Sequence, residues 1–194
     1  MLFLPRLLPR SMFRFAAGAA AGYLLAVRPW HLRWGADDAE VHGEMAGDDL
    51  VTVPQYQATR AVTVEAPPAA VWPWVVRFGG YVPGAYTGPA PGEGGEQPDL
   101  KAGEALPGVQ DAVVERAEPP HTLVLAQRGA EAVASCSIAL RELPDNRTRM
   151  VFRVRIRAEP GLGGVGYLAR MDLSDFVAMR RRMLTVKERA EATA

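Results

Sequence analysis

The sequence has a single cysteine, Cys136, and only three histidines among its 194 residues. One cysteine excludes an internal disulfide framework, which needs pairs of them. The histidines, at His31, His42 and His121, are too scattered for the spacing of a zinc site, in which two ligands usually lie about one helical turn apart. We therefore expect neither a disulfide nor a metal centre.

The chain also lacks an excess of charge of either sign, because 22 basic side chains balance 22 acidic ones. Sequence-independent binding to nucleic acid draws its affinity from basic residues that neutralise phosphates. This composition excludes nucleic acid as a partner. The length suits one core-bearing domain with an appendage.

Acidic residues are absent from residues 1–34, and lysine and arginine are absent from residues 35–58. This segregation predicts three parts: a basic and apolar segment over 1–34, an acidic linker over 35–58 and a domain over 59–192. The acidic part lacks the Asp-x-Asp-x-Asp-Gly pattern of a calcium loop. A solvated linker is therefore its simplest interpretation.

An uncharged stretch of 13 residues, 15–27, lies between Arg14 and Arg28. As a helix it covers about 20 Å, less than the roughly 30 Å of a bilayer core. Snorkelling of Arg14, and Trp30 and Trp34 as interfacial anchors, would extend the embedded part. Three alternatives stay open: a membrane anchor, a cleaved secretory signal, or an Ala-rich helix packed on the domain. The protein is accordingly membrane-associated, secreted or cytoplasmic.

From residue 59 the hydrophobic pattern becomes regular. Val62 and Val64 alternate with smaller or polar residues as in a half-buried strand, and Pro68 then begins a helix that ends before Gly79. The Gly- and Pro-rich run 79–98 predicts a loop, which we expect to be a mobile lip over a cavity mouth. Five further antiparallel strands are expected at about 102–106, 111–118, 121–127, 132–142 and 147–157.

Arginines alternate with apolar residues along the last of these strands. A solvated face that discourages strand pairing is the simpler interpretation, and a binding strip for an acidic partner is the alternative. On the preceding strand Cys136 shares the apolar face, so it is expected to be a small buried hydrophobe. The arginines are Arg149, Arg153, Arg155 and Arg157, and the opposite face carries Met150, Phe152, Val154 and Ile156.

A helical period over 172–191 predicts a long helix lying on the apolar face of the sheet. We expect Phe176 and Met183 to face that sheet. The preceding run GLGGVG at 161–166 matches the G-x-G-x-x-G pattern of dinucleotide-binding proteins. No βαβ unit surrounds it, so we interpret it as a flexible hinge and expect no cofactor.

Several runs resemble the START-like, or SRPBCC, superfamily, which includes polyketide cyclase/dehydrase-type proteins. The resemblance implies an α+β helix-grip fold, in which a curved antiparallel sheet of about six strands wraps the C-terminal helix. It also implies an apolar cavity that holds a hydrophobic small molecule. Relatives commonly have a longer insert after the first helix, where this chain has only 79–98. The runs are RPWHLRWGADDAEV at 28–41, AGDDLV at 46–51, ATRAVTVEAPPAAVWPWVVRFG at 58–79, LKAGEALP at 100–107 and FVAMRRRMLTVKERAE at 176–191.

The leading hypothesis is a non-enzymatic carrier or sensor of a lipid- or polyketide-like molecule, held near a membrane by residues 1–34. The alternative is a cyclase or dehydratase that uses Gln127, Glu115 or His121, and a third is an interaction domain without a cavity. No catalytic residue is identified, because no titratable pair is visibly placed for acid–base chemistry. The cavity-lining candidates are Trp74, Phe78, Tyr81, Tyr86, Leu125, Cys136, Ile138, Phe152, Val154, Phe176 and Met183.

Overall fold

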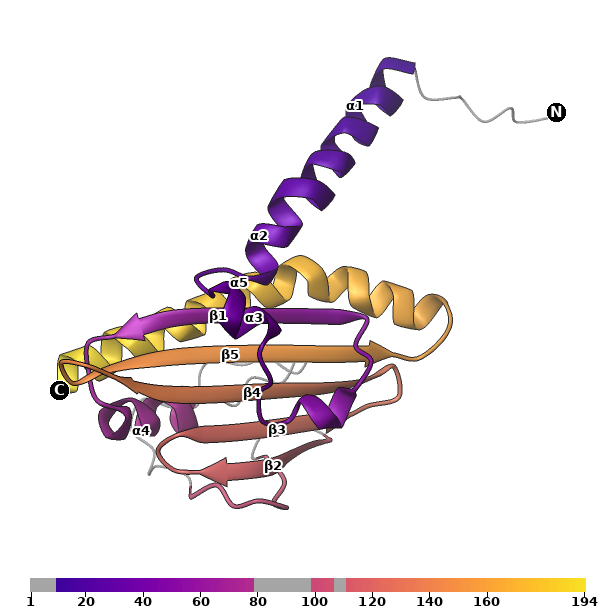
Figure 1. Ribbon diagram of the computed structural model, residues 1–194. Coiled ribbons are helices and arrows are strands. Elements are labelled where there is room, and N and C mark those ends of the chain that lie inside the picture. The colour runs from indigo at the N-terminus through magenta and orange to yellow at the C-terminus, as the bar shows by residue number, and fades with distance from the viewer. Residues whose placement is uncertain (1–9, 79–98, 107–110) are drawn as a thin grey trace.

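The structure is a computed structural model that describes residues 10–78, 99–106 and 111–194. Its centre is a five-stranded antiparallel sheet in the order β1-β5-β4-β3-β2 (Figure 1). The α+β class and the antiparallel sheet with a long C-terminal helix are confirmed. About six strands were expected, but the segment near 102–106 forms only an isolated bridge from Ala105 to Val113. The strands are β1 Tyr56–Val64, β2 Ala112–Glu118, β3 Thr122–Arg128, β4 Ala132–Leu143 and β5 Arg147–Ala158.

The first and last strands of the sheet are neighbours. In β1, Tyr56 lies opposite Ile156 of β5 and Val64 lies opposite Thr148, so nine consecutive residue pairs join the two strands. Side chains alternate along a strand, so in each strand every second side chain points to one side of the sheet and the others point to the opposite side. We call the face packed against helices α4 and α5 the inner face, and the opposite one the outer face.

Two helices cover the inner face. Helix α4, Pro68–Phe78, lies where the sequence predicts it, with Pro68 in the first turn. Helix α5, Leu162–Thr193, has 32 residues and begins ten residues earlier than expected. The run 161–166 therefore forms the cap and first turns of α5, and its interpretation as a flexible hinge is wrong.

Close packing explains the glycines at this helix start. A Cβ atom on Gly164 would lie 1.9 Å from the carbonyl oxygen of Glu159 and 3.2 Å from the Cβ of Ala158. Such distances are inside van der Waals contact, so only glycine lets α5 begin directly against the end of β5. Gly161, which caps the helix, has φ +119°, a conformation that other residues rarely adopt.

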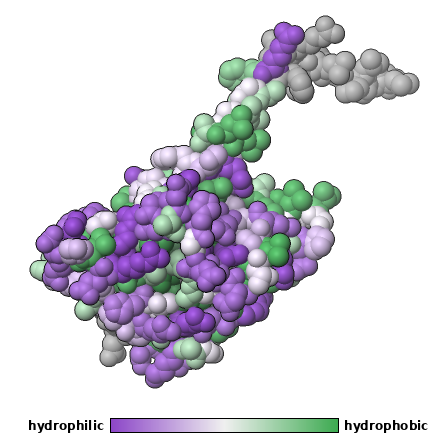
Figure 2. All heavy atoms as spheres, viewed as in Figure 1, coloured by the Kyte–Doolittle hydropathy of each residue, from purple (hydrophilic) through white to green (hydrophobic). Residues whose placement is uncertain are grey.

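The N-terminal segment forms one helical run that projects away from the sheet (Figure 1). It consists of α1 Arg10–Gly22, a π-helical turn η1 Tyr23–Val27 and α2 Arg28–Leu32, and we call residues 10–32 the N-terminal helix. Apolar side chains gather on it (Figure 2), with Phe15 81% and Leu25 80% exposed. Across the residues that the structure describes, no helix has both the length and the apolar character needed to cross a membrane.

The acidic segment packs on the outer face of the sheet. It contains α3 Asp38–His42 and the 3-10 turn η2 Asp48–Val51. The Asp37 side chain accepts a hydrogen bond from the Glu40 amide, and the Glu40 side chain accepts one from the Asp37 amide, which makes a capping box. Glu40 is only 5% exposed. The interpretation of this segment as solvated is therefore wrong for Glu40 and its neighbours.

The same packing corrects the interpretation of the arginine row. Glu40 accepts hydrogen bonds from Nε and Nη2 of Arg149 at 2.7 and 2.8 Å, and Asp48 pairs with Arg153 at 2.6 Å and with Arg155 at 3.0 Å. The Arg153 side chain is 2% exposed. Three of the four arginines are thus not a solvated face, because they bind the acidic segment of their own chain. Arg157 is exposed, as expected.

Candidate functional site

The inner face is an apolar surface made of aligned cross-strand rows. One row runs from Val154 through Cys136 and Leu125 to Val114, and these side chains come from β5, β4, β3 and β2. All four are 0 to 1% exposed. The register therefore brings one set of sequence candidates together at the centre of the sheet.

A second row lies beside the first. It contains Phe152, Ile138 and Leu123, which are also at most 1% exposed. Met183 of α5 is fully buried in the same hydrophobic cluster, and Trp74 of α4 is partly buried against it. The structure thus gathers seven of the candidates in one core. Tyr81, Tyr86 and the side chain of Phe78 lie outside the described residues.

The helices do not cover this surface evenly. Helices α4 and α5 contact each other most; within the sheet, α5 mainly contacts β1 and β5, and α4 mainly contacts β4 and β5. The apolar inner face continues onto β3 and β2, through Leu123, Leu125, Val114 and Ala112. The apolar surface is therefore wider than the main contact area of α4 and α5.

Cys136 lies at the middle of the first row and is a free, buried thiol. Burial raises its pKa far above the ordinary value, with a smaller contribution from the negative charge of Asp175. A thiol held in its protonated form is a poor nucleophile. The expectation that Cys136 is a small buried hydrophobe is confirmed.

A charged cluster interrupts the apolar inner face at β1. Arg60 donates from Nη1 to Oδ2 of Asp175 at 2.6 Å and from Nε to the carbonyl oxygen of His31 at 2.8 Å. The Tyr56 hydroxyl donates to the same Asp175 oxygen at 2.7 Å. Arg60 and Asp175 have fully buried side chains. This cluster joins β1, α5 and the last turn of the N-terminal helix.

A second polar cluster lies one helical turn earlier on α5. The Tyr23 hydroxyl donates to Asp172 at 2.6 Å, and Arg28 pairs with the same carboxylate at 3.1 Å. Burial and the hydrogen bond to Asp172 raise the pKa of Tyr23 to about 12. Asp172 and Asp175 are three residues apart and therefore share one face of α5. Together they fix the lower part of the N-terminal helix to the domain.

His31 lies between these two clusters and is fully buried. Its Nε2 is 3.2 Å from the Tyr23 hydroxyl oxygen. Its Nδ1 has no hydrogen-bond partner within the described part of the chain. Burial lowers the pKa of His31, and the opposing attraction of Asp172 is smaller. The histidine is therefore held neutral and packs as part of the core.

Phe176 packs where α5, α2 and β1 meet. Its ring centroid lies 5.3 Å from that of Trp30, 5.5 Å from that of His31 and 5.3 Å from the Arg60 guanidinium carbon. Its ring neighbours thus come from the N-terminal helix, whereas Met183 packs in the core of the inner face. The structure does not place Phe176 and Met183 in one lining.

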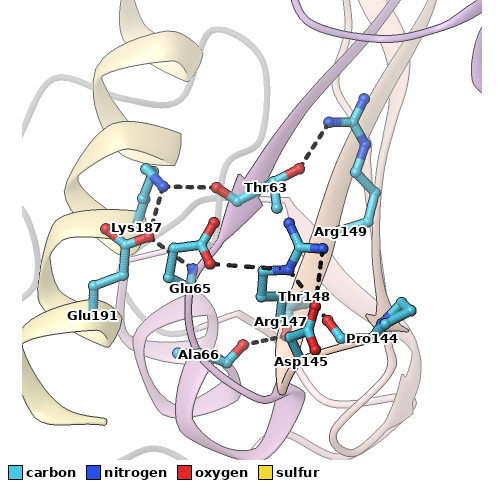
Figure 3. Close-up of polar contacts among 10 residues, drawn as sticks. All are labelled: Thr63, Glu65, Ala66, Pro144, Asp145, Arg147, Thr148, Arg149, Lys187 and Glu191. Carbon is cyan, nitrogen blue, oxygen red and sulfur yellow. Dashed lines mark hydrogen bonds and ion pairs between the residues drawn. The ribbon is translucent and has the colours of Figure 1, made fainter.

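The C-terminal part of α5 is fastened to the end of β1 (Figure 3). Lys187 Nζ donates to the carbonyl oxygen of Thr63 at 2.7 Å and to Oε1 of Glu191 at 2.6 Å. Glu191 also accepts from the Glu65 amide at 2.7 Å. Burial alone would raise the pKa of Glu191, but the Glu65 amide and Lys187 together outweigh it and lower that pKa overall. Helix α5 is thereby held near its middle and at its C-terminal end.

The polar residues considered for catalysis do not converge. Gln127 lies on the inner face near the end of β3, between Ala112 and Ala134. Glu115 forms an exposed ion pair with Arg128 at 2.6 Å. His121 is exposed in the turn before β3, as expected, and lies about 20 Å along the strand from Gln127.

Sequence reasoning missed the Arg60 and Asp175 cluster, although a signal was present. Arg60 stands two residues before Val62 and four before Val64, in phase with the apolar side of the strand. A charged residue at an inward position must have a buried partner. The partner, Asp175, lies inside α5 and not at its start, and no local pattern marks it as buried.

Comparison with known proteins finds no matching family model and no matching curated protein. Solved structures give low similarity. CalU16 from Micromonospora echinospora is 22% identical over 70% of this chain and 84% of its own, with a TM-score of 0.36. CV1439 from Chromobacterium violaceum is 13% identical over 69% and 97%, with a TM-score of 0.43. Ms6760 from Mycobacterium smegmatis is 11% identical over 71% and 89%, with a TM-score of 0.42.

Proposed function

We propose that the protein is a START-like (SRPBCC) carrier or sensor, which binds a hydrophobic small molecule between the inner face of its sheet and helices α4 and α5. The observation that supports this most is the width of the apolar inner face. It extends over β3 and β2, beyond the strands that α4 and α5 mainly contact. A lipid- or polyketide-like molecule would bury its apolar surface against the row from Val154 to Val114.

Binding is favoured over catalysis by the polar groups at hand. The charged cluster of Arg60, Asp175 and Tyr56 is fully paired within the protein. Glu115 is paired with Arg128, His121 is exposed in the turn before β3, and Gln127 lies on the inner face about 20 Å along the strand from His121. A cyclase or dehydratase needs at least two polar groups that converge on its substrate.

The test begins with the full-length protein as purified. Native mass spectrometry should detect a co-purifying hydrophobic molecule, and the fluorescent fatty acid cis-parinaric acid should bind saturably. Absence of both a co-purifying molecule and saturable probe binding contradicts the proposal.

A matched pair of substitutions at one position sharpens the test. Cys136→Phe adds bulk at the centre of the first row, and Cys136→Val changes the side chain there with little change in volume. We expect the first to lose at least about tenfold in probe affinity and the second to keep it. Equal affinity in the two variants would place the probe somewhere other than the inner face.

We further propose that residues 1–34 hold the protein at a membrane. This rests on the exposed apolar side chains of the N-terminal helix and on the absence of acidic residues before Asp37. The full-length protein should then sediment with membranes, and substitution of Phe15 and Leu25 by serine should release it. Recovery of the unmodified protein in the soluble fraction would contradict this second proposal.

A further inference from the structure

Helix α5 exposes a second surface of mixed apolar and basic character. Leu162 is 92% exposed, Val165 65% and Val177 60%. Apolar residues are visible both on the N-terminal helix and at the end of the domain where α5 begins (Figure 2). We select six exposed residues of this helix and call them the α5 stripe: Leu162, Val165, Arg170, Val177, Arg180 and Arg181.

Helical spacing places most of these residues along one side of α5. Leu162 and Arg180 are 18 residues apart, which is five whole turns of an α-helix, and Val177 lies about 60° away from them. Met179, which is buried, lies about 160° from Val177 around the helix axis. Val165 lies five whole turns before the buried Met183 and therefore points to the same side as it, but it is exposed near the start of the helix.

The exposed charge on this side is basic. Between Leu162 and Lys187 the only acidic residues are Asp172 and Asp175. Asp175 is fully buried, and Asp172 is 15% exposed and engaged by Arg28 and Tyr23. Arg170 forms a 3.7 Å ion pair with the exposed Glu131, so the basic character of the stripe comes from Arg180 and Arg181. Such a surface is complementary to an anionic one.

The α5 stripe is continuous with the base of the N-terminal helix. The Arg180 guanidinium carbon lies 5.0 Å from the ring centroid of Trp34, and Trp30 packs edge-on against Phe176. In Figure 1 the N-terminal helix rises from the side of the domain along which α5 runs. Both apolar and basic surfaces therefore lie on the same side of the molecule.

From this arrangement we infer that the α5 stripe is a second membrane-contacting surface, which binds the anionic headgroups of a bilayer that the N-terminal helix enters. The inference rests on the proposed membrane contact of residues 1–34. Leu162, Val165 and Val177 bury their side chains at the interface, while Arg180 and Arg181 contact phosphates. The two surfaces together fix the orientation of the domain, with the sheet below α5 and facing away from the lipid.

The test is flotation of the full chain with two kinds of vesicle, phosphatidylcholine alone and phosphatidylcholine mixed with phosphatidylglycerol. We expect about tenfold stronger binding to the anionic vesicles. The triple variant Leu162→Ser, Val165→Ser, Val177→Ser should bind them about tenfold more weakly. Val53→Ser, which changes another highly exposed apolar residue, is the control and should bind as the unmodified chain does. Thermal unfolding of each variant verifies the fold.

The outcomes distinguish the inference about the α5 stripe from the proposal that residues 1–34 contact a membrane. If Phe15→Ser with Leu25→Ser abolishes binding and the triple variant binds normally, the α5 stripe is not a contact surface and only the N-terminal helix is. If the unmodified chain binds neither kind of vesicle, both the proposed membrane contact of residues 1–34 and the inference about the α5 stripe are overturned. If light scattering shows a dimer that the triple variant loses while vesicle binding is unchanged, the stripe joins two copies of the chain and the inference is overturned.

Discussion

Arg60 of β1 and Asp175 of α5 form an ion pair of 2.6 Å in which both side chains are completely excluded from solvent. The pair lies on the otherwise apolar inner face, and the Tyr56 hydroxyl and the His31 carbonyl complete its hydrogen bonds. Burial of charge is costly, so a pair of this kind contributes to specificity more than to net stability. It fixes which turn of α5 lies over β1.

Replacing one partner of this pair should be severely destabilising. Asp175→Leu leaves the Arg60 guanidinium buried without its counter-charge, and we expect a loss of about 3 to 5 kcal/mol in the free energy of unfolding. The double variant Arg60→Met, Asp175→Leu removes both charges and should be clearly more stable than the sum of the single changes predicts. Urea unfolding of the four proteins measures this coupling. Strictly additive losses would show that the two residues do not interact.

The pairing of Glu40 with Arg149 predicts a specific pH dependence. Burial raises the pKa of Glu40, but the hydrogen bonds from Arg149 and from the Asp37 amide outweigh it, so the pKa lies below its ordinary value. The stabilisation is therefore complete above the unfolded-state pKa of about 4.3 and is lost as the pH falls through the lower folded-state pKa. Glu40→Gln should be less stable than the unmodified protein at pH 7, and the difference should shrink below about pH 4. A difference that stays constant with pH would contradict this account.

Two glycines of α5 should respond oppositely to the same substitution. Gly164→Ala places a methyl group against the Glu159 carbonyl, so we expect a loss of about 1 to 3 kcal/mol in unfolding free energy. A methyl group on Gly166 meets no atom within 4 Å, so Gly166→Ala should raise helix propensity and stabilise by about 0.5 to 1 kcal/mol. Thermal unfolding measures both. Equal effects would mean that α5 does not begin against β5 as described.

Tyr23 should control how firmly the N-terminal helix is held. Tyr23→Phe removes the hydrogen bond to Asp172 and the contact with His31. We expect amide hydrogen exchange around η1 to become about tenfold faster, with little change in the sheet. Leu25→Ala, on the same turn but exposed, is the control and should leave the exchange rates unchanged. Comparable acceleration in both variants would indicate general fraying of the helix.

Local patterns were sufficient to predict much of the fold. The strict alternation of Arg and apolar residues defined β5 and its two faces, and Pro68 and Gly79 marked the two ends of α4. The row containing Cys136, Leu125 and Val154 followed from the same alternation, because antiparallel register aligns inward positions across strands. These elements depend only on the periodic spacing of apolar residues and on the Pro and Gly positions, which can be read from a single sequence.

Other features depend on contacts distant in sequence. Arg149 and Arg153 were interpreted as solvated because their partners, Glu40 and Asp48, are more than 100 residues away. The start of α5 was misplaced because glycine has low helix propensity, whereas here the close approach of Gly164 to β5 requires it. Packing overrode local preference at both places, and only the folded chain displays that packing.

Because β1 pairs with β5, the first strand of the sheet cannot pair until the last strand has been synthesised. β1 pairs along its length with β5, the last strand, and the ion-pair partner of Arg60 is Asp175, which follows 115 positions later. Until Ala158 has left the ribosome, β1 has no strand partner, and its apolar side chains lie exposed beside an N-terminal helix that has already emerged. A fragment that stops before Arg147 therefore lacks β5, the strand that lies between β1 and β4 in the sheet. The core is therefore completed only after β5 and Asp175 have been synthesised.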